Sequence, residues 1–339
     1  MRLCVGTAKG IVILNPERAG PPLMVLAVPS SVWCLARDCA DPNLLYAGSV
    51  HNAQMGSARG KGSLARSNDG GRAWQDITPG LMRDEDVWAV AAAPDVPGEV
   101  FIGTSHARIM HSLDGGRGFT ECSAFLKMPG RERWTFPPAP HVPHVRAFAF
   151  DPNHSNVLYA AVEEGGIFRS RDRGMSFEPL SQGIHPDVHA VAVDPCDGRR
   201  LYATTGRGFY YSVNSGNSWQ FVKGLNRSYA VPLIVRKDCM YIAAAAGPPP
   251  LWSLGALGAD AVIFRSIDQG RGFTPLPGEA GGVHRTRGMV MRFFSMPGED
   301  GEFFAALSDG SIISIDERNE RVVTVAEKLP PIYDMVALT

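Results

Sequence analysis

The sequence lacks several features that would place it in a specialised class of protein. Its six cysteines include no Cys-x-x-Cys pair, and Cys34 and Cys39 are the two that lie closest together. In a chain of 339 residues this usage predicts reduced thiols and argues against a disulfide-stapled scaffold. No apolar run approaches the ~18 residues that a membrane-spanning helix needs. We therefore expect no membrane span.

Charge and the N-terminal segment also lack any special signal. The formal net charge of −1 predicts neither a nucleic-acid partner nor a membrane surface. The first residues, MRLCVGTAKGIVIL, have no charged region followed by a long apolar stretch and a small-residue cleavage site. With 45% apolar residues the composition is that of an ordinary globular protein. We therefore expect a cytoplasmic protein without a signal peptide.

What the sequence does contain is a short motif that occurs five times. In the first copy, SNDGGRAW, a Ser is followed by Asp two positions later, Gly two further on, and an aromatic residue three after that. The other copies keep this pattern, with Asn in place of Asp in one of them. The copies begin at Ser67, Ser112, Ser170, Ser212 and Ser266. Their spacing of 42 to 58 residues is typical of propeller blades.

Four apolar segments accompany each copy. Around the fourth copy they read VHAVAVDP, RLYATT, GFYYSV and, after the motif, a short closing segment. Segments of this length, rich in Val, Ile, Phe and Tyr and split by Gly, Pro and Asp, predict β-strands joined by tight turns. Four-stranded units that repeat around an axis form a β-propeller.

The predicted fold is therefore all-β, a seven-bladed β-propeller in a single domain over residues 1–339. The sixth unit keeps four strands but lacks the motif. The seventh combines three N-terminal strands with the C-terminal segment PIYDMVAL, which closes the ring and leaves no exposed sheet edge at the seam. The predicted blades span approximately residues 31–78, 87–122, 145–180, 188–222, 229–276, 287–326, and 332–338 plus 1–28.

The repeated motif is typical of a turn between the third and fourth strands of a blade. Asp or Asn accepts backbone hydrogen bonds there, Gly supplies a positive φ, and the aromatic residue packs into the sheet core. With these motifs the chain resembles the Asp-box, or BNR-repeat, propellers, which include sialidases, sortilin-type receptors, xyloglucan-cleaving glycosidases and photosystem II assembly factors. In those relatives the motif is structural and lies opposite the ligand-binding face. The resemblance implies a structural role for Asp69, Asp114, Asp172, Asn214 and Asp268.

The resemblance predicts architecture rather than chemistry, because these relatives differ in function. Function is expected where the blades stop agreeing, in long loops that the layout assigns to one face. These loops are residues 51–63, 123–144, 246–260 and 277–286. Loops grouped on one face of a rigid scaffold commonly carry function, and neutral insertion is the alternative.

Seven of the nine histidines map to that face. The stretch APHVPHVR offers His141 and His144 with two residues between them, so these two are the predicted metal ligands. Neutral imidazoles bind Zn, Fe or Mn, and Glu163, Asp86 or Asp187 would supply an oxygen ligand. The alternative is that the histidines are separate polar loop residues.

Arginine and aromatic residues give the predicted ligand-binding set. Arg146, Arg207 and Arg287 come from three blades, and guanidinium groups bind carboxylate or phosphate bidentately. Sialidases bind a substrate carboxylate with three arginines, although their Arg-Ile-Pro signature is absent here. Large residues of the innermost strands predict either a stacking wall for a ligand or packing between blades. The full predicted set is Trp33, His51, Trp88, His106, Arg146, Arg207, Tyr229, Arg287 and Tyr333.

These residues predict an enzyme, either a hydrolase or a lyase, that acts on a small anionic or sugar-like ligand at the loop-rich mouth of the propeller. Glu163, Asp187 and His189 are the predicted acid–base group, with metal-assisted chemistry as a further option. A glycosidase needs two carboxylates that flank one bond. The alternative is a non-catalytic binding or assembly module that uses the same face for a protein partner.

Overall fold

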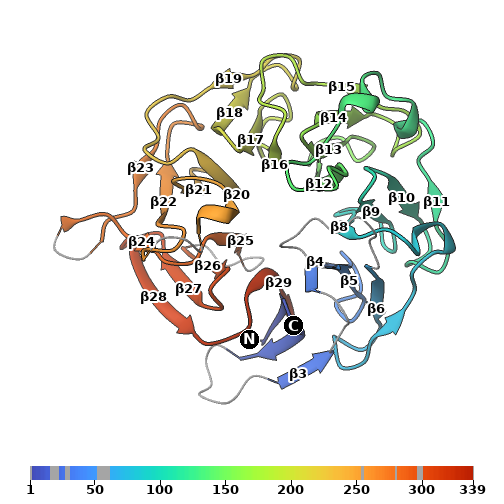
Figure 1. Cartoon of the computed structure of the whole chain (residues 1–339), viewed down its shortest axis with the longest axis horizontal. Coiled ribbons are helices and arrows are strands. Elements are labelled where there is room, and N and C mark those ends of the chain that lie inside the picture. Colours follow the sequence, from blue (N-terminus) through green and yellow to red (C-terminus); the bar gives the residue numbers. More distant parts are fainter. Residues whose placement is uncertain are drawn as a thin grey trace. The chain divides into compact units, whose positions relative to one another are not determined.

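The computed structural model consists almost entirely of short β-strands, with four 3₁₀ helices among the described residues (Figure 1). It describes residues 2–15, 23–26, 31–51, 62–252, 256–278, 281–295 and 301–338. Within these ranges no helix has the length and apolar character needed to cross a bilayer. The strands form a seven-bladed β-propeller of antiparallel sheets, as the sequence predicts.

The chain divides into two compact units. Unit 1 contains residues 1–150, 155–179 and 333–339, and unit 2 contains residues 151–154 and 180–332. Four of the seven blades lie in unit 1 and three in unit 2.

Three blades of unit 1 follow one another along the chain, and each runs from its first to its fourth strand. The first is β4 (Ser31–Arg37), β5 (Leu45–Val50), β6 (Leu64–Ser67) and β7 (Gln75–Asp76). The second is β8 (Val87–Ala92), β9 (Val100–Thr104), β10 (Ile109–Ser112) and β11 (Thr120–Glu121). The third is β12 (His144–Phe150), β13 (Leu158–Glu163), β14 (Gly166–Ser170) and β15 (Glu178–Pro179).

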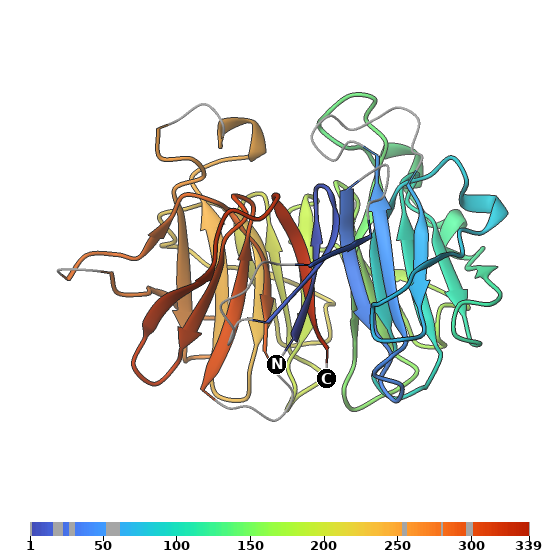
Figure 2. The same cartoon turned by 90° about the horizontal axis from the view of Figure 1, so that it is seen from below.

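The fourth blade of unit 1 joins the two ends of the chain. Its strand order is β29 (Ile332–Leu338), β1 (Arg2–Thr7), β2 (Gly10–Leu14) and β3 (Leu23–Leu26), which confirms the predicted closure. Figure 2 shows β1 and β29 side by side. The buried Asp334 carboxylate accepts a hydrogen bond of 2.8 Å from the backbone N–H of Leu35 and so ties β29 to β4.

Unit 2 holds the remaining three blades. They are β16 (Val188–Val193), β17 (Leu201–Thr205), β18 (Gly208–Ser212) and β19 (Gln220–Phe221); β20 (Tyr229–Val235), β21 (Met240–Ala245), β22 (Ala261–Ser266) and β23 (Thr274–Pro275); and β25 (Val290–Phe294), β26 (Glu302–Leu307), β27 (Ile312–Asp316) and β28 (Arg321–Ala326). Part of the predicted loop 277–286 instead forms a fifth strand, β24 (Arg285–Thr286), which pairs with β22.

Neighbouring blades of unit 1 pack closely because a glycine in one blade faces a valine in the next. A Cβ added at Gly48 in β5 would lie 2.4 Å from Val87 Cγ1, and one added at Gly103 in β9 would lie 2.7 Å from Val145 Cγ1. Only a residue without a Cβ allows this approach. The device repeats from blade to blade and fixes how the first strands β4, β8 and β12 are placed.

Candidate functional site

The five repeated turns share one hydrogen-bond pattern, in which the motif side chains bind the turn's own backbone. In the first, Ser67 Oγ donates to Asp69 Oδ1 at 2.8 Å and accepts from Gly71 N at 2.9 Å, while Asp69 Oδ1 accepts from Ala73 N at 2.9 Å. The Ala73 N–H holds the pKa of Asp69 below its usual value. The same contacts surround Asp114, Asp172, Asn214 and Asp268. These side chains are used within their turns.

At the opposite ends of the strands in unit 1, four predicted ligand-binding residues come together. The rings of Trp33 and Tyr333 stack with centroids 4.5 Å apart, and Trp33 and Trp88 meet edge to face at 5.0 Å. The Arg146 guanidinium lies over the Trp33 ring at 4.9 Å. Each of the four belongs to a different blade, so these contacts favour the packing alternative for the two tryptophans over an open stacking wall.

Beside this cluster, Glu163 faces two basic groups. Glu163 and His144 are paired across β12 and β13, and His144 Nε2 lies 3.0 Å from Glu163 Oε2. Arg146 Nε lies 3.3 Å from the same oxygen. The Trp88 ring stacks on the His144 imidazole at 3.8 Å, and both side chains are buried. The carboxylate is thus fixed in position by an imidazole and a guanidinium.

A second carboxyl group, Asp86, lies just before β8 and connects to the same place. Ser105 Oγ accepts the Asp86 N–H at 2.8 Å, and Ser105 forms an isolated β-bridge with His144. Asp86 Oδ1 accepts the His51 N–H at 2.7 Å. Asp86 is only 3% exposed, and this burial raises the pKa of its carboxyl group above the ordinary value. Unit 1 therefore holds two buried carboxyl groups in different electrostatic surroundings.

The predicted loop 123–144 packs onto the strand ends that carry these groups. It contains the 3₁₀ helices η2 (Phe125–Lys127) and η3 (Arg131–Arg133). Arg131 Nη1 donates to Ala107 O at 2.7 Å, and Arg131 also binds the carbonyl of His106. The Phe136 ring meets Trp88 at 6.1 Å and His144 at 4.8 Å. The segment is folded against unit 1 through an arginine and an aromatic side chain.

The two predicted metal ligands have different surroundings. His144 is buried against Trp88, whereas His141 is exposed and its Nδ1 bonds to Phe136 O at 2.9 Å. Among the described residues, neither belongs to a group of three or more His, Cys, Asp or Glu side chains whose ligand atoms lie within 4.8 Å of one another. A Zn, Fe or Mn site at His141 and His144 stays a prediction.

In unit 2, two members of the predicted acid–base group lie together. His189 Nε2 is 3.1 Å from Asp187 Oδ1, His189 Nδ1 is 2.6 Å from Ala230 O, and the Tyr229 ring lies 4.6 Å from the imidazole. A Cβ added at Gly206 would lie 1.9 Å from Asp187 Oδ2, so the carboxylate needs a glycine there. Glu163 belongs to unit 1, where its histidine partner is His144. The group of Glu163, Asp187 and His189 stays a prediction.

The remaining predicted ligand-binding residues are exposed side chains. His51 and His106 lie in unit 1, and Arg207 and Arg287 lie in unit 2. The backbone of His51 donates its N–H to Asp86, that of Arg207 donates its N–H to Thr205 Oγ1, and the Arg287 carbonyl accepts the Ala259 N–H. Ligand binding by these four side chains stays a prediction.

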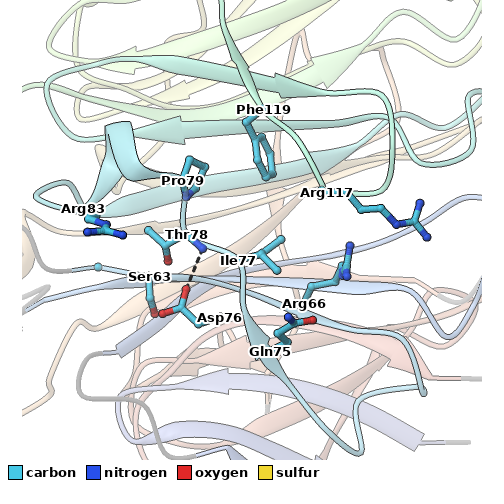
Figure 3. Close-up of a pocket in the computed structure, with 12 residues that line it drawn as sticks. Ser63, Arg66, Gln75, Asp76, Ile77, Thr78, Pro79, Arg83, Arg117 and Phe119 are labelled. Carbon is cyan, nitrogen blue, oxygen red and sulfur yellow. Dashed lines mark hydrogen bonds between the residues drawn. The ribbon is translucent and has the colours of Figure 1, made fainter.

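A separate groove of about 1080 Å³ lies beside the outer strands β6 and β7 of unit 1 (Figure 3). Figure 3 shows Arg83 toward one end, Arg66 and Arg117 toward the other, and Asp76 between them. Asp76 Oδ1 accepts the Thr78 N–H at 2.8 Å. Its arginines suit an anion. Asp76 is the one carboxylate among the described residues that line it, so the groove lacks the pair that acid–base chemistry requires.

The sequence missed two members of the unit 1 site. Ser105 connects Asp86 to His144, and Phe136 covers Trp88. Ser105 follows a buried strand without any motif of its own. Phe136 lies in WTFPPAPH, where the prolines mark an ordered segment but do not identify its contacts.

Comparison with known proteins identifies the fold. No protein-family model matches the sequence. No curated protein matches it either. Among solved structures, an ancestral GH74 enzyme aligns with a TM-score of 0.63 and 17% identity over 94% of this chain and 39% of its own. A GH74 xyloglucanase from Xanthomonas campestris gives 0.62 and 16% over 86% and 45%. YCF48 bound to D1 peptide gives 0.55 and 15% over 89% and 84%.

These likenesses have clear limits. The chain spans about two fifths of the length of the GH74 enzymes that it matches. At 15–17% identity the likeness establishes the propeller fold alone, and it includes both glycoside hydrolases and a peptide-bound protein.

Proposed function

We propose that the protein is a hydrolase that cleaves a small sugar-like or anionic ligand by acid–base catalysis in unit 1. The site is formed by Asp86, Trp88, His144, Arg146 and Glu163 at the strand ends opposite the repeated turns, and we call it the mouth-end site. The observation that carries this proposal is that two buried acidic residues, Asp86 and Glu163, are held near each other: the Asp86 backbone N–H bonds to Ser105, Ser105 forms a β-bridge with His144, and His144 binds the Glu163 carboxylate. Glycoside hydrolysis needs one carboxyl group that gives a proton and one carboxylate that acts as base or nucleophile.

The surroundings of the two groups suggest their roles. Burial raises the pKa of Asp86, which suits a proton donor to the leaving-group oxygen. Glu163 is fixed by His144 and Arg146 and suits the base that takes a proton from water. As the water oxygen bonds to the anomeric carbon, the glycosidic C–O bond breaks and the leaving oxygen receives the Asp86 proton. The GH74 neighbours support a sugar substrate by analogy of fold.

The test is reducing-sugar release from a panel of glycans, including xyloglucan and acidic polysaccharides, by the full chain. The proposal predicts turnover by the wild-type protein, its loss in Asp86→Asn and Glu163→Gln, and its retention in Glu178→Gln. Glu178 is a matched control because it lies on the outer strand β15 of the same blade, is half-exposed and pairs with Arg169. Turnover that survives both mouth-end substitutions would reject this site.

A second candidate is a non-catalytic module that binds a protein partner. The observation that favours it is that Glu163, His144 and Arg146 already bind one another, as in a structural polar network. One of the structural neighbours is a peptide-bound protein. Binding of a glycan or peptide by the wild-type protein without turnover of any panel member would favour this candidate over the hydrolase.

A further inference from the structure

The mouth-end site of unit 1 contains a buried hydrogen-bond donor that has no acceptor in the protein. Trp88 is 5% exposed, and its Nε1–H has no hydrogen-bond partner in the described part of the chain. Other tryptophans do have one: Trp74 donates to Gly71 O at 3.1 Å, Trp219 to Leu180 O at 2.7 Å and Trp252 to Gly247 O at 2.8 Å. Because a buried donor without an acceptor costs free energy, Trp88 requires an explanation.

Arg146 supplies more donors at the same site. Its guanidinium lies over the Trp33 ring and faces Glu163 through Nε. Within the ranges that the structure describes, no hydrogen bond joins the Arg146 side chain to another group, and its buried Nε faces Glu163 without hydrogen-bond geometry. A guanidinium carries five N–H donors, so the terminal Nη atoms remain available to a ligand. Its side chain is 13% exposed, so it remains accessible to solvent.

Trp88 and Arg146 are neighbours by two independent routes. Both contact the ring of Trp33, Trp88 at 5.0 Å and Arg146 at 4.9 Å. Both also flank the His144–Glu163 pair, with Trp88 stacked on His144 and Arg146 facing Glu163. These shared neighbours place the Trp88 and Arg146 side chains in one region of unit 1.

The groups of this region that remain available to a ligand are hydrogen-bond donors. The region offers N–H donors from Trp88 and Arg146, while the nearby Glu163 carboxylate already faces His144 and Arg146. A neutral sugar presents hydroxyl groups that donate as well as accept, so it matches a set of N–H donors less fully than a group that only accepts. Arg146 faces Glu163 through Nε, and its two Nη groups remain for a carboxylate, which is acceptor-only and fits a guanidinium in bidentate geometry.

We propose that Trp88 Nε1–H and the Arg146 guanidinium bind a carboxylate of the ligand, so that the substrate class is an acidic sugar, such as a uronic acid, rather than a neutral one. The sugar part of this inference rests on the proposed function, whereas the carboxylate part rests on the two unsatisfied donors. Trp88 and Arg146 are then specificity-determining residues that hold the substrate while Asp86 and Glu163 act on it.

The test uses two probes, D-galacturonate and its methyl ester, which differ in the charge of one group and in a single methyl; neither has a glycosidic bond to the next sugar. Binding to the full-length protein is measured by calorimetry or ligand-observed NMR. The inference predicts that the acid binds at least about tenfold more tightly than the ester, as expected for the loss of a charge-assisted hydrogen bond. Equal affinities for the two probes would overturn it.

Substitutions test whether Trp88 and Arg146 cause the preference for the acid over the ester. Trp88→Phe keeps an aromatic ring against His144 but deletes the N–H, and we expect about tenfold weaker binding of the acid with little change for the ester. Arg146→Gln should abolish the preference for the acid. Trp74→Phe is the matched control, because it makes the same change where the N–H already has an acceptor, and it should leave binding unchanged. Acid binding that is unaltered in Trp88→Phe and Arg146→Gln would place the carboxylate elsewhere and overturn the inference.

The two proposals fail in different ways. Hydrolysis of neutral glycans that depends on Asp86 and Glu163, without any preference for galacturonate, keeps the proposed function and rejects the acidic-sugar inference. Selective galacturonate binding that depends on Trp88 and Arg146, without hydrolysis of acidic oligosaccharides, rejects the enzyme and keeps the carboxylate site. Far-UV and near-UV circular dichroism of each variant verifies that a loss of binding is not a loss of fold.

Discussion

Carboxyl groups at the two ends of the strands in unit 1 differ in how they are held. At the repeated turns, Asp69 and Asp114 accept backbone N–H groups three and four residues ahead, and the pKa of each lies below its usual value because of those bonds. At the mouth end, Asp86 and Glu163 take partners from other strands, and burial raises the pKa of Asp86. The turn carboxylates serve local structure, and the mouth-end groups have the burial that acid–base chemistry exploits.

The difference explains why the repeated motif and the proposed catalytic groups lie at different ends of the same blades. A turn that satisfies its carboxylate with its own backbone can be copied into any blade, because it needs nothing from its neighbours. The Asp86–Ser105–His144–Glu163 connection joins two blades, and in the described part of unit 1 it is seen between these two alone. The predictions below test this contrast, from the largest expected effect to the smallest.

The largest effect is expected at the mouth end. Glu163→Gln removes the charge of the proposed base while keeping its shape, and kcat/KM for the substrate should fall by about 10²–10⁴-fold. Glu178→Gln, on the outer strand β15 of the same blade, should change it little, because Glu178 pairs there with Arg169 and Arg171 and has no part in the proposed mechanism. Steady-state kinetics on the two purified variants measures the contrast. Equal kinetics in both would remove Glu163 from the mechanism.

The next effect concerns the close approach of blades that places β8 beside β5. Gly48→Ala would put a Cβ 2.4 Å from Val87 Cγ1 and 2.5 Å from Cys34 Sγ, so the free energy of unfolding should fall by about 1–3 kcal/mol. Gly80→Ala is the matched control, because nothing lies within 4 Å of an added Cβ. Urea unfolding followed by tryptophan fluorescence measures both variants. A neutral Gly48→Ala would contradict the packing described here.

Loss of a turn hydroxyl should reduce stability without affecting function. Ser170 Oγ is buried, donates to Asp172 at 2.8 Å and accepts Gly174 N at 2.7 Å. Ser170→Ala leaves that N–H without its acceptor and should lower the free energy of unfolding by about 1–3 kcal/mol, with ligand binding unchanged. Ser155→Ala, at an exposed position, should have no effect. A Ser170→Ala variant of normal stability but altered ligand binding would reverse the roles assigned to the two ends.

The smallest expected effect is on the pH dependence of stability, which should have opposite signs for a carboxyl group in a repeated turn and for one at the mouth-end site. Asp69 has a lowered pKa in the folded state, so its stabilising contribution is present above the unfolded pKa of about 3.9 and is lost as pH falls. Asp86 has a raised pKa, so its contribution is present below about pH 3.9 and is lost as pH rises through the folded value. The two groups should therefore tilt the stability curve in opposite directions.

Thermal unfolding from about pH 3 to pH 7 tests this pair of signs. Relative to wild type, Asp69→Asn should become less stable as pH rises, and Asp86→Asn should become more stable. Differences from wild type that slope the same way in both variants would show that the two carboxyl groups do not occupy contrasting environments.

The fold could be predicted from local patterns in the sequence. The strands follow runs of apolar residues between Gly, Pro and Asp turns, and each turn motif makes its contacts within five residues, so both leave a pattern that can be read along the chain. Strand β24 was not predicted, because its two residues pair with β22 but do not belong to an apolar run that would indicate a strand.

The site was only partly predictable, because its contacts are non-local. Trp33, Trp88, Arg146 and Tyr333 were expected at one level, and their rings and guanidinium do meet. The sequence grouped Glu163 with Asp187 and His189 for acid–base chemistry, which stays a prediction. It considered His144 beside Glu163 only as part of a metal site, and β-pairing places the two directly opposite each other within unit 1. The role of Ser105 depends on a bridge between blades, and no spacing along the chain encodes it.

The most direct test of the account is the pH dependence of kcat/KM for the wild-type protein and for Asp86→Asn and Glu163→Gln. The account predicts that the wild-type profile has an alkaline limb from Asp86, because burial raises the pKa of its carboxyl group. Asp86→Asn should lose this limb and have a reduced maximum, and Glu163→Gln should keep the limb at a much lower maximum. An alkaline limb that is unchanged in Asp86→Asn, or a maximum that is unchanged in Glu163→Gln, would contradict an acid–base pair at the mouth-end site.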